Sequence, residues 1–353
     1  MRPSIWHFTA ALPPAVNGVG DFAAILADAL RARGAKSGFI TQWAGSHEFR
    51  GSPVRRLARR SADGLQHTLE ASGARTILLH FSGYGYARWG LCWWLAEGLC
   101  RWRRRGSERR LITVFHELYA TGPFWRTSFW TALPQRRIGR SLASISDAAM
   151  TTSPAGAEKL KSWHPELPIV VSPVFSNVGE VEAPVPFSDR GPFAVVFGQE
   201  AQRQRLYSAL TGAPPAIGEG LRRFGVARVL DIGPAAAVPA SVAGLPVERL
   251  GLLDAQAVSA RLSEARVGLV DYPLHVVTKS GIMAAFFAHG LLTVNTSTVG
   301  TLPDGIEEGR HFAHPHRLSE PTFDAEAVAA EGFAWYRPHS RDATAEIVER
   351  FIS

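Results

Sequence analysis

The sequence contains very little cysteine, with only Cys92 and Cys100 among its 353 residues. On one helix these two would lie about 12 Å apart along the axis, at about 1.5 Å per residue, which is too far for a disulfide. Two cysteines alone do not imply a structural zinc site. We therefore predict no metal site and expect both cysteines to be packing residues.

Long hydrophobic runs are absent as well. No stretch approaches the roughly 20 consecutive apolar residues that a membrane-spanning helix requires. Near the N-terminus, His7, Pro13 and Pro14 interrupt what would be the apolar part of a signal peptide. We therefore expect a cytoplasmic protein whose first apolar segment is a buried strand.

Acidic residues are fewer than basic ones, 31 against 38, which gives a formal net charge of +7. Many arginines lie in or just after a tryptophan-rich segment, Trp89–Arg105. Two interpretations stay open for it: a buried helix whose cationic end complements its dipole, or a patch that rests on the anionic cytoplasmic face of a membrane. The basic residues are not spread along a groove and no binding motif for nucleic acid occurs, so we predict no nucleic-acid partner.

Apolar strand patterns alternate with amphipathic helix patterns in two series, which predicts an α/β protein with parallel sheets covered by helices. The expected strands cover residues 4–10, 37–41, 76–81, 111–115, 150–153 and 169–172, then 193–197, 228–232, 247–250, 267–272 and 291–295. The length favours two domains, and prolines and glycines gather between Pro173 and Pro192, where we place the connection. We expect an N-terminal domain over residues 1–180, a C-terminal domain over 181–340, and a terminal helix over 341–353 that packs back on the first domain.

The stretch Asn17-Gly18-Val19-Gly20-Asp21 joins the first strand to an expected helix from Asp21 to Arg33. Gly18 and Gly20 would let the backbone approach a ligand closely, and N–H groups at a helix start favour an anion. A tight turn into the helix is the alternative. The third glycine of a dinucleotide-binding fingerprint is missing. For Asp21 two roles stay open, a helix cap or a general base.

Four segments, in order along the chain, together resemble the GT-B glycosyltransferases, especially the retaining nucleotide-sugar-dependent enzymes of the family 4 type. They are Asn17–Phe22 with its helix, His116-Glu117 after the strand 111–115, Ser146–Ser153, and the helix end Ala284–Gly290. The resemblance implies two Rossmann-like domains whose parallel sheets face a central cleft. It also implies transfer of a sugar from a nucleotide-diphosphate sugar to a hydroxyl acceptor, and we expect neither a metal ion nor a separate cofactor.

The chain departs from this family at one place. Retaining members carry two glutamates eight positions apart, where this sequence has Val277 and Ala285, so a ribose-binding carboxylate is not carried over. Beside them stand Lys279, Ser280 and Gly281. Ser280 can cap a helix, Gly281 exposes backbone N–H groups and the lysine adds charge, which suits a diphosphate. An ordinary helix cap with a solvated lysine is the alternative.

Two arginines offer a second cation for the phosphates. Arg203 and Arg205 follow Gly198-Gln199-Glu200, and the planar fork of a guanidinium suits a pyrophosphate. Residues two apart do not share one helix face, so we predict that Arg203 alone enters the cleft. The alternative is that both are solvated.

His116 and Glu117 follow a strand end, where side chains face a ligand more often than the core. The histidine could bond a sugar hydroxyl or a developing charge, and Glu117 could orient or deprotonate the acceptor. Tyr84 and Tyr86 follow the strand 76–81 and would line the acceptor side. Structural roles, such as plain turn chemistry, are the alternatives.

These residues predict a glycosyltransferase of polysaccharide or glycoconjugate synthesis, with a nucleotide sugar as donor and a saccharide or lipid-linked saccharide as acceptor. A catalytically degenerate GT-B protein that binds a nucleotide sugar or glycan without turnover is the alternative, and the missing glutamate pair favours it. A nucleotide-sugar epimerase on the same fold would need several carboxylates in the cleft, and few are available.

Overall fold

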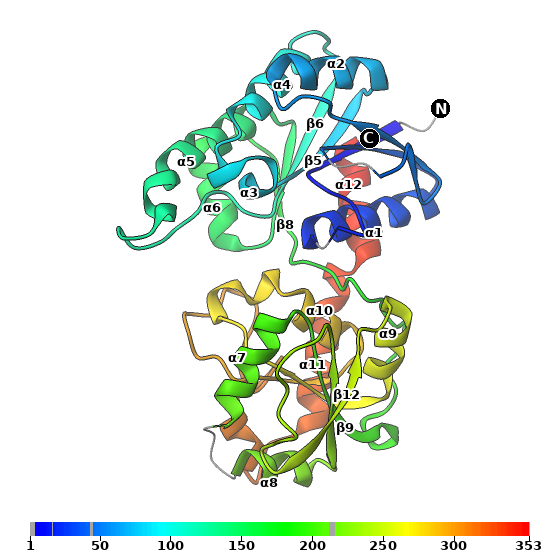
Figure 1. Cartoon of the computed structure of the whole chain (residues 1–353), viewed down its shortest axis with the longest axis vertical. Coiled ribbons are helices and arrows are strands. Elements are labelled where there is room, and N and C mark those ends of the chain that lie inside the picture. The colour runs from blue at the N-terminus through cyan, green and yellow to red at the C-terminus, as the bar shows by residue number, and fades with distance from the viewer. Residues whose placement is uncertain (1–3, 16, 43–44, 212–215, 353) are drawn as a thin grey trace. The chain divides into compact units, whose positions relative to one another are not determined.

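The computed structural model describes residues 4–15, 17–42, 45–211 and 216–352. The chain divides into two compact units (Figure 1): unit 1 comprises Met1–Pro173 with Arg341–Ser353, and unit 2 comprises Val174–Ser340. Each unit is an α/β body around its own parallel sheet. No helix in the described part of the chain is both long and apolar enough to cross a membrane.

Unit 1 contains an eight-stranded sheet of order β3-β4-β2-β1-β5-β6-β7-β8. Its strands are β1 (Ser4–Thr9), β2 (Lys36–Thr41), β3 (Glu48–Phe49), β4 (Ser52–Arg56), β5 (Thr76–Phe81), β6 (Arg110–Phe115), β7 (Ala148–Thr151) and β8 (Ile169–Val171). All neighbours pair in parallel except the β3–β4 hairpin. Every residue of β5 is buried, as expected for a central strand with both faces covered. Gly38 lies opposite Trp6, and a Cβ at position 38 would come within 2.9 Å of the Trp6 ring.

Helices cover this sheet. They are α1 (Gly18–Ala32), α2 (Ala62–Ser72), α3 (Gly83–Tyr86), the 3-10 turn η1 (Arg88–Gly90), α4 (Trp93–Arg103), α5 (Thr127–Ile145), α6 (Pro154–Trp163) and α12 (Arg341–Ile352). Figure 1 shows α12, in red, beside α1, in blue. Arg33, at the end of α1, pairs with Glu349 at 2.8 Å and with Glu346 at 3.4 Å. The last helix of the chain therefore belongs to unit 1.

Unit 2 contains a six-stranded sheet of order β11-β12-β10-β9-β13-β14. Its strands are β9 (Gly191–Phe197), β10 (Arg228–Ile232), β11 (Ser241–Val242), β12 (Leu245–Gly251), β13 (Ala265–Val270) and β14 (Leu292–Asn295). The helices are α7 (Glu200–Thr211), α8 (Ala216–Arg223), α9 (Ala255–Glu264), α10 (Gly281–Ala288) and α11 (Ala325–Tyr336), with the 3-10 turns η2 (Phe187–Asp189), η3 (Leu274–Lys279), η4 (Pro315–Ser319) and η5 (Arg337–His339). The pairs among β9, β10, β12, β13 and β14 are all parallel, and only β11 is antiparallel.

The segment expected to connect the domains packs on unit 2 instead. Val174 N–H donates to the Thr278 carbonyl at 2.9 Å, and Ser176 N–H donates to the Tyr336 hydroxyl at 2.8 Å. The buried Arg190 guanidinium donates to three backbone carbonyls of the same unit. The predicted boundary at residue 180 therefore lies inside unit 2, and the chain passes between the units after Pro173 and again after Ser340.

The glycine-containing stretch after β1 also differs from expectation. Helix α1 begins at Gly18, and its N-cap is Asn17, whose side-chain oxygen accepts from the N–H groups of Val19 at 3.0 Å and Gly20 at 3.3 Å. The capping role considered for Asp21 is therefore wrong, because Asp21 lies in the first turn, one turn beyond the cap. There its charge still favours the positive end of the helix.

The two glycines of this turn differ in the space that a side chain would have. A Cβ at position 20 would collide with the Ala11 carbonyl oxygen and lie 3.2 Å from its carbon, whereas a Cβ at position 18 would meet nothing within 4 Å. The first turn of α1 thus packs directly on the backbone that leaves β1, and only Gly20 permits that approach.

We predict that Gly20→Ala lowers the free energy of unfolding by about 2 kcal/mol or more, because the backbone contact must open. Gly18→Ala should change it by less than about 0.5 kcal/mol, since the added methyl group meets no atom. Urea denaturation of both variants and the wild type would measure this. Equal losses would show that the turn does not pack on Ala11 as described.

Candidate functional site

Three glycines end neighbouring strands of unit 2 and form what we call the glycine edge: Gly198 after β9, Gly233 after β10 and Gly251 at the end of β12. Gly198 N–H donates to the Ile232 carbonyl at 3.3 Å, and Gly233 N–H donates to the Gly251 carbonyl at 2.8 Å. Their φ angles are 129°, 155° and 72°, which residues with side chains rarely adopt. The carboxyl edge of the sheet therefore presents bare backbone, as sites for ligands in such sheets do.

The start of α10 lies against this edge. A Cβ at Gly198 would come within 2.7 Å of the Ile282 side chain, so the first turn of α10 contacts the end of β9. Ser280 is buried and accepts from the Met283 N–H at 3.2 Å, which confirms it as the N-cap. A Cβ at Gly281 would have no neighbour closer than the Asn177 side-chain oxygen at 3.7 Å. The helix start is thus capped, and its backbone lies open beside the glycine edge.

Lys279 stands immediately before this cap. Its side chain is half-buried, and it forms no ion pair with any residue that the structure describes. A cation next to a helix N-terminus is a favourable combination for a phosphate. Its phosphate-binding role stays a prediction, and so do those of Ser280 and Gly281.

Arg203 does not lie where we predicted. Its side chain is 1% exposed and forms a buried ion pair with Asp231 of β10. It also donates to the carbonyl of Gly198 at 3.1 Å and to that of Pro234, while Tyr207 donates to the second Asp231 oxygen at 2.6 Å. Arg203 therefore holds the glycine edge from within unit 2, and its burial keeps it away from a ligand. The lone carboxylate in an apolar strand, Asp231, was the signal that sequence reasoning missed.

Arg205 is the exposed cation of the pair, and it lies 3.8 Å from Asp271. Asp271 follows β13 and accepts from the Thr296 hydroxyl at 2.7 Å. Leu252, which follows Gly251 at the same edge, is 78% exposed. Leu252 was not singled out from sequence as an apolar surface.

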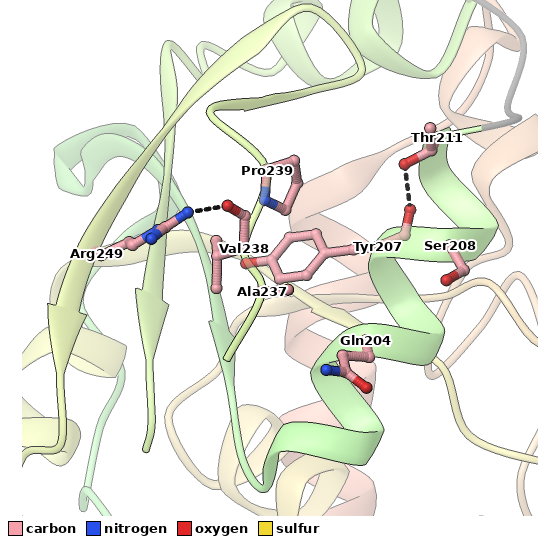
Figure 2. A pocket seen from close by; sticks show the side chains of 8 residues that line it. All are labelled: Gln204, Tyr207, Ser208, Thr211, Ala237, Val238, Pro239 and Arg249. Atoms are coloured by element: carbon pink, nitrogen blue, oxygen red, sulfur yellow. Dashed lines mark hydrogen bonds between the residues drawn. The ribbon is translucent and has the colours of Figure 1, made fainter. Parts of the chain in front are cut away.

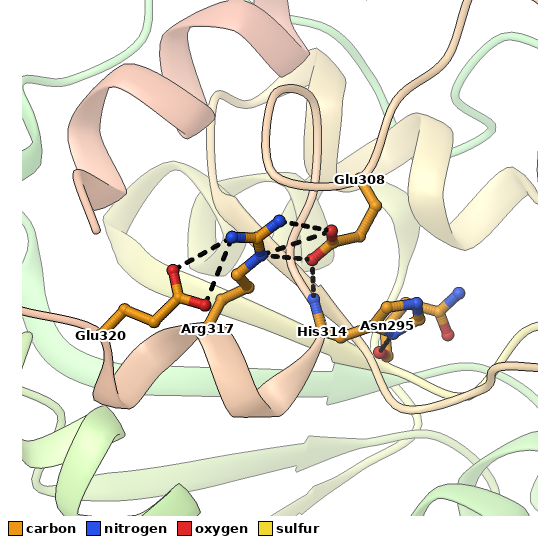
Figure 3. Close-up of polar contacts among 5 residues, drawn as sticks. All are labelled: Asn295, Glu308, His314, Arg317 and Glu320. Atoms are coloured by element: carbon orange, nitrogen blue, oxygen red, sulfur yellow. Dashed lines mark hydrogen bonds and ion pairs between the residues drawn. The ribbon is translucent and has the colours of Figure 1, made fainter. Parts of the chain in front are cut away.

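A polar network orders the chain after β14 (Figure 3). Buried Asn295 exchanges hydrogen bonds with the backbone of Tyr272, at 2.9 and 2.8 Å, and its own carbonyl accepts from the His314 ring at 2.7 Å. Arg317 pairs with Glu308 at 3.2 Å and with Glu320 at 3.1 Å. Burial would raise the pKa of Glu308, but the hydrogen bond from Arg317 holds it below its ordinary value. Glu308 is thus already committed to a structural partner.

The carboxyl edge of unit 1 carries the remaining predicted residues. The ring of Phe22, near the start of α1, lies edge-on to His116 with centroids 4.9 Å apart, so this part of the helix is adjacent to the end of β6. Exposed Glu117 accepts from the Ser82 hydroxyl at 2.9 Å, which joins the ends of β5 and β6. Burial raises the pKa of the half-buried Asp21 carboxyl, and the charge of Arg50 opposes that shift. A carboxyl with a raised pKa at a sheet edge is a candidate general base.

Tyr84 and Tyr86 lie in different environments. Tyr84 is exposed, whereas Tyr86 is a core residue whose hydroxyl lies 2.9 Å from the carbonyls of both Phe8 and His80. Burial raises the pKa of Tyr86 well above its ordinary value. The prediction that Tyr86 lines the acceptor side is therefore wrong, because the short helix α3 turns this ring into the core. The role of Tyr84 stays a prediction.

His116 is more enclosed than expected, with 8% of the residue exposed, and it ends a row of three histidines. Its Nε2 lies 3.4 Å from His80 Nδ1, and His80 Nε2 lies 3.1 Å from His7 Nδ1. Burial lowers the pKa of His7 to about 3 and that of His80 well below its ordinary value. These two imidazoles are therefore neutral at pH 7. Histidines within the apolar strands 4–10 and 76–81 were the available signal for this row.

The row predicts acid sensitivity of the fold. Below about pH 6.5 the unfolded chain takes up protons at His7 and His80, while the folded protein does not. The free energy of unfolding should therefore fall as the pH decreases, by up to about 1.4 kcal/mol per pH unit for each histidine, and for His7 until its folded pKa is reached.

His7→Leu should reduce this pH dependence between pH 6.5 and 4.5, as measured by urea denaturation at several pH values. The matched control is His67→Gln, which changes an exposed histidine on α2 and should leave the profile unaltered. If the free energy of unfolding falls equally steeply with decreasing pH in the wild type and in His7→Leu, His7 is not the neutral buried imidazole described here.

A separate cavity of about 850 Å³ lies in unit 2 between α7 and the chain after β10 (Figure 2). Its lining residues are Gln204, Tyr207, Ser208, Thr211, Ala237, Val238, Pro239 and Arg249. None of them is a predicted site residue. The Tyr207 hydroxyl is bonded to Asp231, and Arg249 donates to the Val238 carbonyl, so we assign no chemistry to this cavity. Among the described residues, no cluster of three or more His, Cys, Asp or Glu side chains could hold a metal ion.

No family model matches the sequence, and no curated protein matches it. Solved structures match over nearly the whole chain. An α-glucosyltransferase in complex with UDP has a TM-score of 0.60 at 11% identity, with 99% of this chain and 100% of that one covered. An α,α-trehalose 6-phosphate synthase from Burkholderia multivorans has a TM-score of 0.60 at 10% identity, with 100% and 96% covered.

Two further matches widen the range of ligands among these structures. A protein assigned as a UDP-N-acetylglucosamine 2-epimerase, from Listeria monocytogenes, has a TM-score of 0.55 at 12% identity, with 99% of this chain and 95% of that one covered. Another α-glucosyltransferase complex contains UDP and a 13-mer DNA, with a TM-score of 0.57 at 11% identity and 100% and 99% covered. The matches confirm the GT-B fold for this chain. Family 4 membership and the predicted central cleft stay predictions.

Proposed function

We propose that this protein is a glycosyltransferase that moves a sugar from a nucleotide-diphosphate sugar to a hydroxyl of a saccharide or lipid-linked saccharide, in polysaccharide or glycoconjugate synthesis. The observation that carries the proposal is the contact between the glycine edge and the start of α10. It combines bare backbone, the N–H groups at the helix start and Lys279, which has no ion-pair partner among the described residues; together these suit a diphosphate. The nucleotides named in the matched structures are consistent with such a ligand.

In this proposal the donor lies along the glycine edge of unit 2. The diphosphate meets Lys279 and the Gly281 N–H, and the exposed side chain of Leu252 offers an apolar surface to the base. Val277 and Ala285 carry apolar, buried side chains, so neither position offers a carboxylate to the ribose. Asp271 is the carboxylate at this edge that we assign to the ribose hydroxyls.

The chemistry requires that the bond between the anomeric carbon and the diphosphate breaks while a bond to the acceptor oxygen forms. Lys279 and the helix start would stabilise the charge on the departing diphosphate, without a requirement for a metal ion. The acceptor proton would pass to Asp21, whose raised pKa suits a base better than that of an ordinary carboxylate. His116 and Glu117 would orient the acceptor. Retention at the anomeric carbon is what the family resemblance implies.

A second candidate is a binding protein that retains the nucleotide-sugar site without turnover. The specific observation in its favour is that both positions of the glutamate pair carry buried apolar side chains. An epimerase is favoured less, because Glu308 pairs with Arg317 and Asp231 pairs with the buried Arg203, so both carboxylates are committed to structural partners.

We predict that Lys279→Ala weakens UDP binding by about 10- to 100-fold, the range expected for a lost charge-assisted contact, while the affinity for uridine stays within twofold. Titration calorimetry would measure both ligands. Arg261→Ala is the matched control, because Arg261 is an exposed cation of unit 2 that pairs with Glu264 on α9. Equal losses for UDP and uridine would show that Lys279 is not at the phosphates.

The catalytic part of the proposal is tested with a panel of nucleotide-diphosphate sugars. We expect slow hydrolysis of at least one donor, with a rate that EDTA leaves unchanged, and a loss of about 100-fold or more in Asp21→Asn, as for other general bases. Donor affinity of this variant should be unaltered. Binding of donors without turnover of any would favour the non-catalytic alternative, and loss of activity in EDTA would disprove metal independence.

A further inference from the structure

Unit 1 exposes a group of large apolar side chains that its core does not explain. We call Phe124, Trp125, Phe129, Trp130 and Leu133 the aromatic face; their exposed fractions lie between 48% and 72%. They occupy the first half of α5 and the residues just before it. Single exposed hydrophobic residues are normal, but a cluster of this size in one segment marks an interaction surface.

The opposite side of α5 packs normally. Thr131, Gln135, Ile138 and Leu142 recur at helical spacing and are buried. Phe129, Trp130 and Leu133 do not share the helical spacing of these positions, and their exposure shows that they point away from the core. The aromatic face is thus not a misplaced part of the core, because the helix already has a complete buried stripe.

The aromatic face is also internally ordered. The Trp130 indole N–H donates to the Phe124 carbonyl at 2.9 Å, which ties the helix to the preceding turn. The rings of Phe124 and Trp125 lie 5.0 Å apart, and those of Phe129 and Trp130 lie 5.5 Å apart, both edge-on. The surface is therefore held in place before any partner binds.

Positive charge accompanies these rings. Residues 118–146 contain four arginines and no aspartate or glutamate. The four are Arg126, Arg136, Arg137 and Arg140, all exposed, and none forms an ion pair within the described parts of the chain. On α5 the last three follow Phe129 and Leu133 along the same exposed side, so apolar and cationic groups share one face.

The segment Trp89–Arg105, for which the sequence left open a buried helix or a membrane-contacting patch, has a different character. Its Leu95, Leu99 and Trp102 are buried. Three of its arginines pair with carboxylates of unit 1: Arg101 with Asp63 and Glu97, Arg103 with Asp147, and Arg105 with Glu70. Most of this segment is therefore a packed helix with neutralised charge. Trp89 remains exposed beside α5, where its carbonyl accepts from the Gln135 amide at 2.6 Å.

We propose that the aromatic face and the four arginines of this segment dock unit 1 on an anionic phospholipid surface. Tryptophan and phenylalanine favour the boundary between headgroups and acyl chains, and unpaired arginines favour lipid phosphates. The charge complementarity argues for this partner. A nucleic acid would bind the arginines but would not account for the five exposed apolar side chains. An acidic protein surface would likewise account for the arginines and not for the aromatic face. The inference does not depend on the proposed enzymatic function, because lipid binding is measured without a donor.

The experiment is vesicle co-sedimentation with the full chain, using vesicles of phosphatidylcholine with or without one quarter phosphatidylglycerol. We expect at least tenfold stronger binding to the anionic vesicles, lost in high salt, since the electrostatic part is screened. Trp125→Ala/Trp130→Ala should lower the partition coefficient about tenfold or more. Each arginine-to-glutamine change at Arg136, Arg137 or Arg140 should lower it about fivefold.

The matched control changes side chains of the same kinds, a tryptophan and an arginine, on the neighbouring helix α4. Trp93→Ala/Arg101→Gln also removes one exposed tryptophan and one exposed arginine, and it should leave vesicle binding within twofold. All changed side chains are exposed, and unaltered urea midpoints would exclude unfolding as the cause of any loss.

Several results would overturn the proposal. They are no binding to either vesicle, equal binding to both, or equal losses in the α4 control. A dimer seen by light scattering and abolished by Trp125→Ala/Trp130→Ala, without vesicle binding, would identify the aromatic face as a self-association surface. Binding of a DNA duplex without vesicle binding would assign the arginines to nucleic acid.

Discussion

The buried ion pair between Arg203 and Asp231 joins the ends of two central strands of unit 2. A guanidinium removed from water needs a carboxylate and further hydrogen-bond acceptors, and here the carbonyls of Gly198 and Pro234 accept from Arg203 beside Asp231. The ends of β9 and β10 are thereby fixed to a common residue. The glycine edge can therefore lack side chains, because the buried Arg203 holds its backbone in position. The features that we assign to donor binding, including the contact with α10, depend on this arrangement.

Unit 1 fixes its corresponding edge by different means. The helix after β1 packs through Gly20 on the backbone of Ala11, and a row of three imidazoles, of which His7 and His80 are neutral, runs from β1 to the end of β6. Both units thus place polar groups at the carboxyl ends of parallel strands and anchor them from the interior. In unit 2 the anchor is a charge pair, and in unit 1 it consists of close backbone packing and uncharged rings. The anchoring in unit 1 therefore depends more on pH than the anchoring in unit 2.

The strands were the most predictable part of the structure, since apolar runs such as 76–81 match β5 at both ends. Helix α5 was missed, because Pro134 breaks the expected pattern and the aromatic residues around it obscure the buried stripe. The wrong assignments of Arg203 and Tyr86 share one cause. Each side chain is removed from the site by a partner distant in sequence, Asp231 or the carbonyl of Phe8, which local patterns do not reveal. Ser280 was correctly predicted as a cap because capping is a local interaction.

The return of α12 to unit 1 has a consequence for how the polypeptide matures. Residues 341–353 follow the whole of unit 2, yet they supply the helix that covers α1 and carries the partners of Arg33. During synthesis the ribosome therefore delivers every residue of unit 2 before unit 1 receives its final helix. Domains fold largely as they emerge from the ribosome. The side of α1 that α12 covers therefore stays exposed in unit 1 while unit 2 forms. A nascent chain stalled before residue 341 would display that incomplete surface to chaperones.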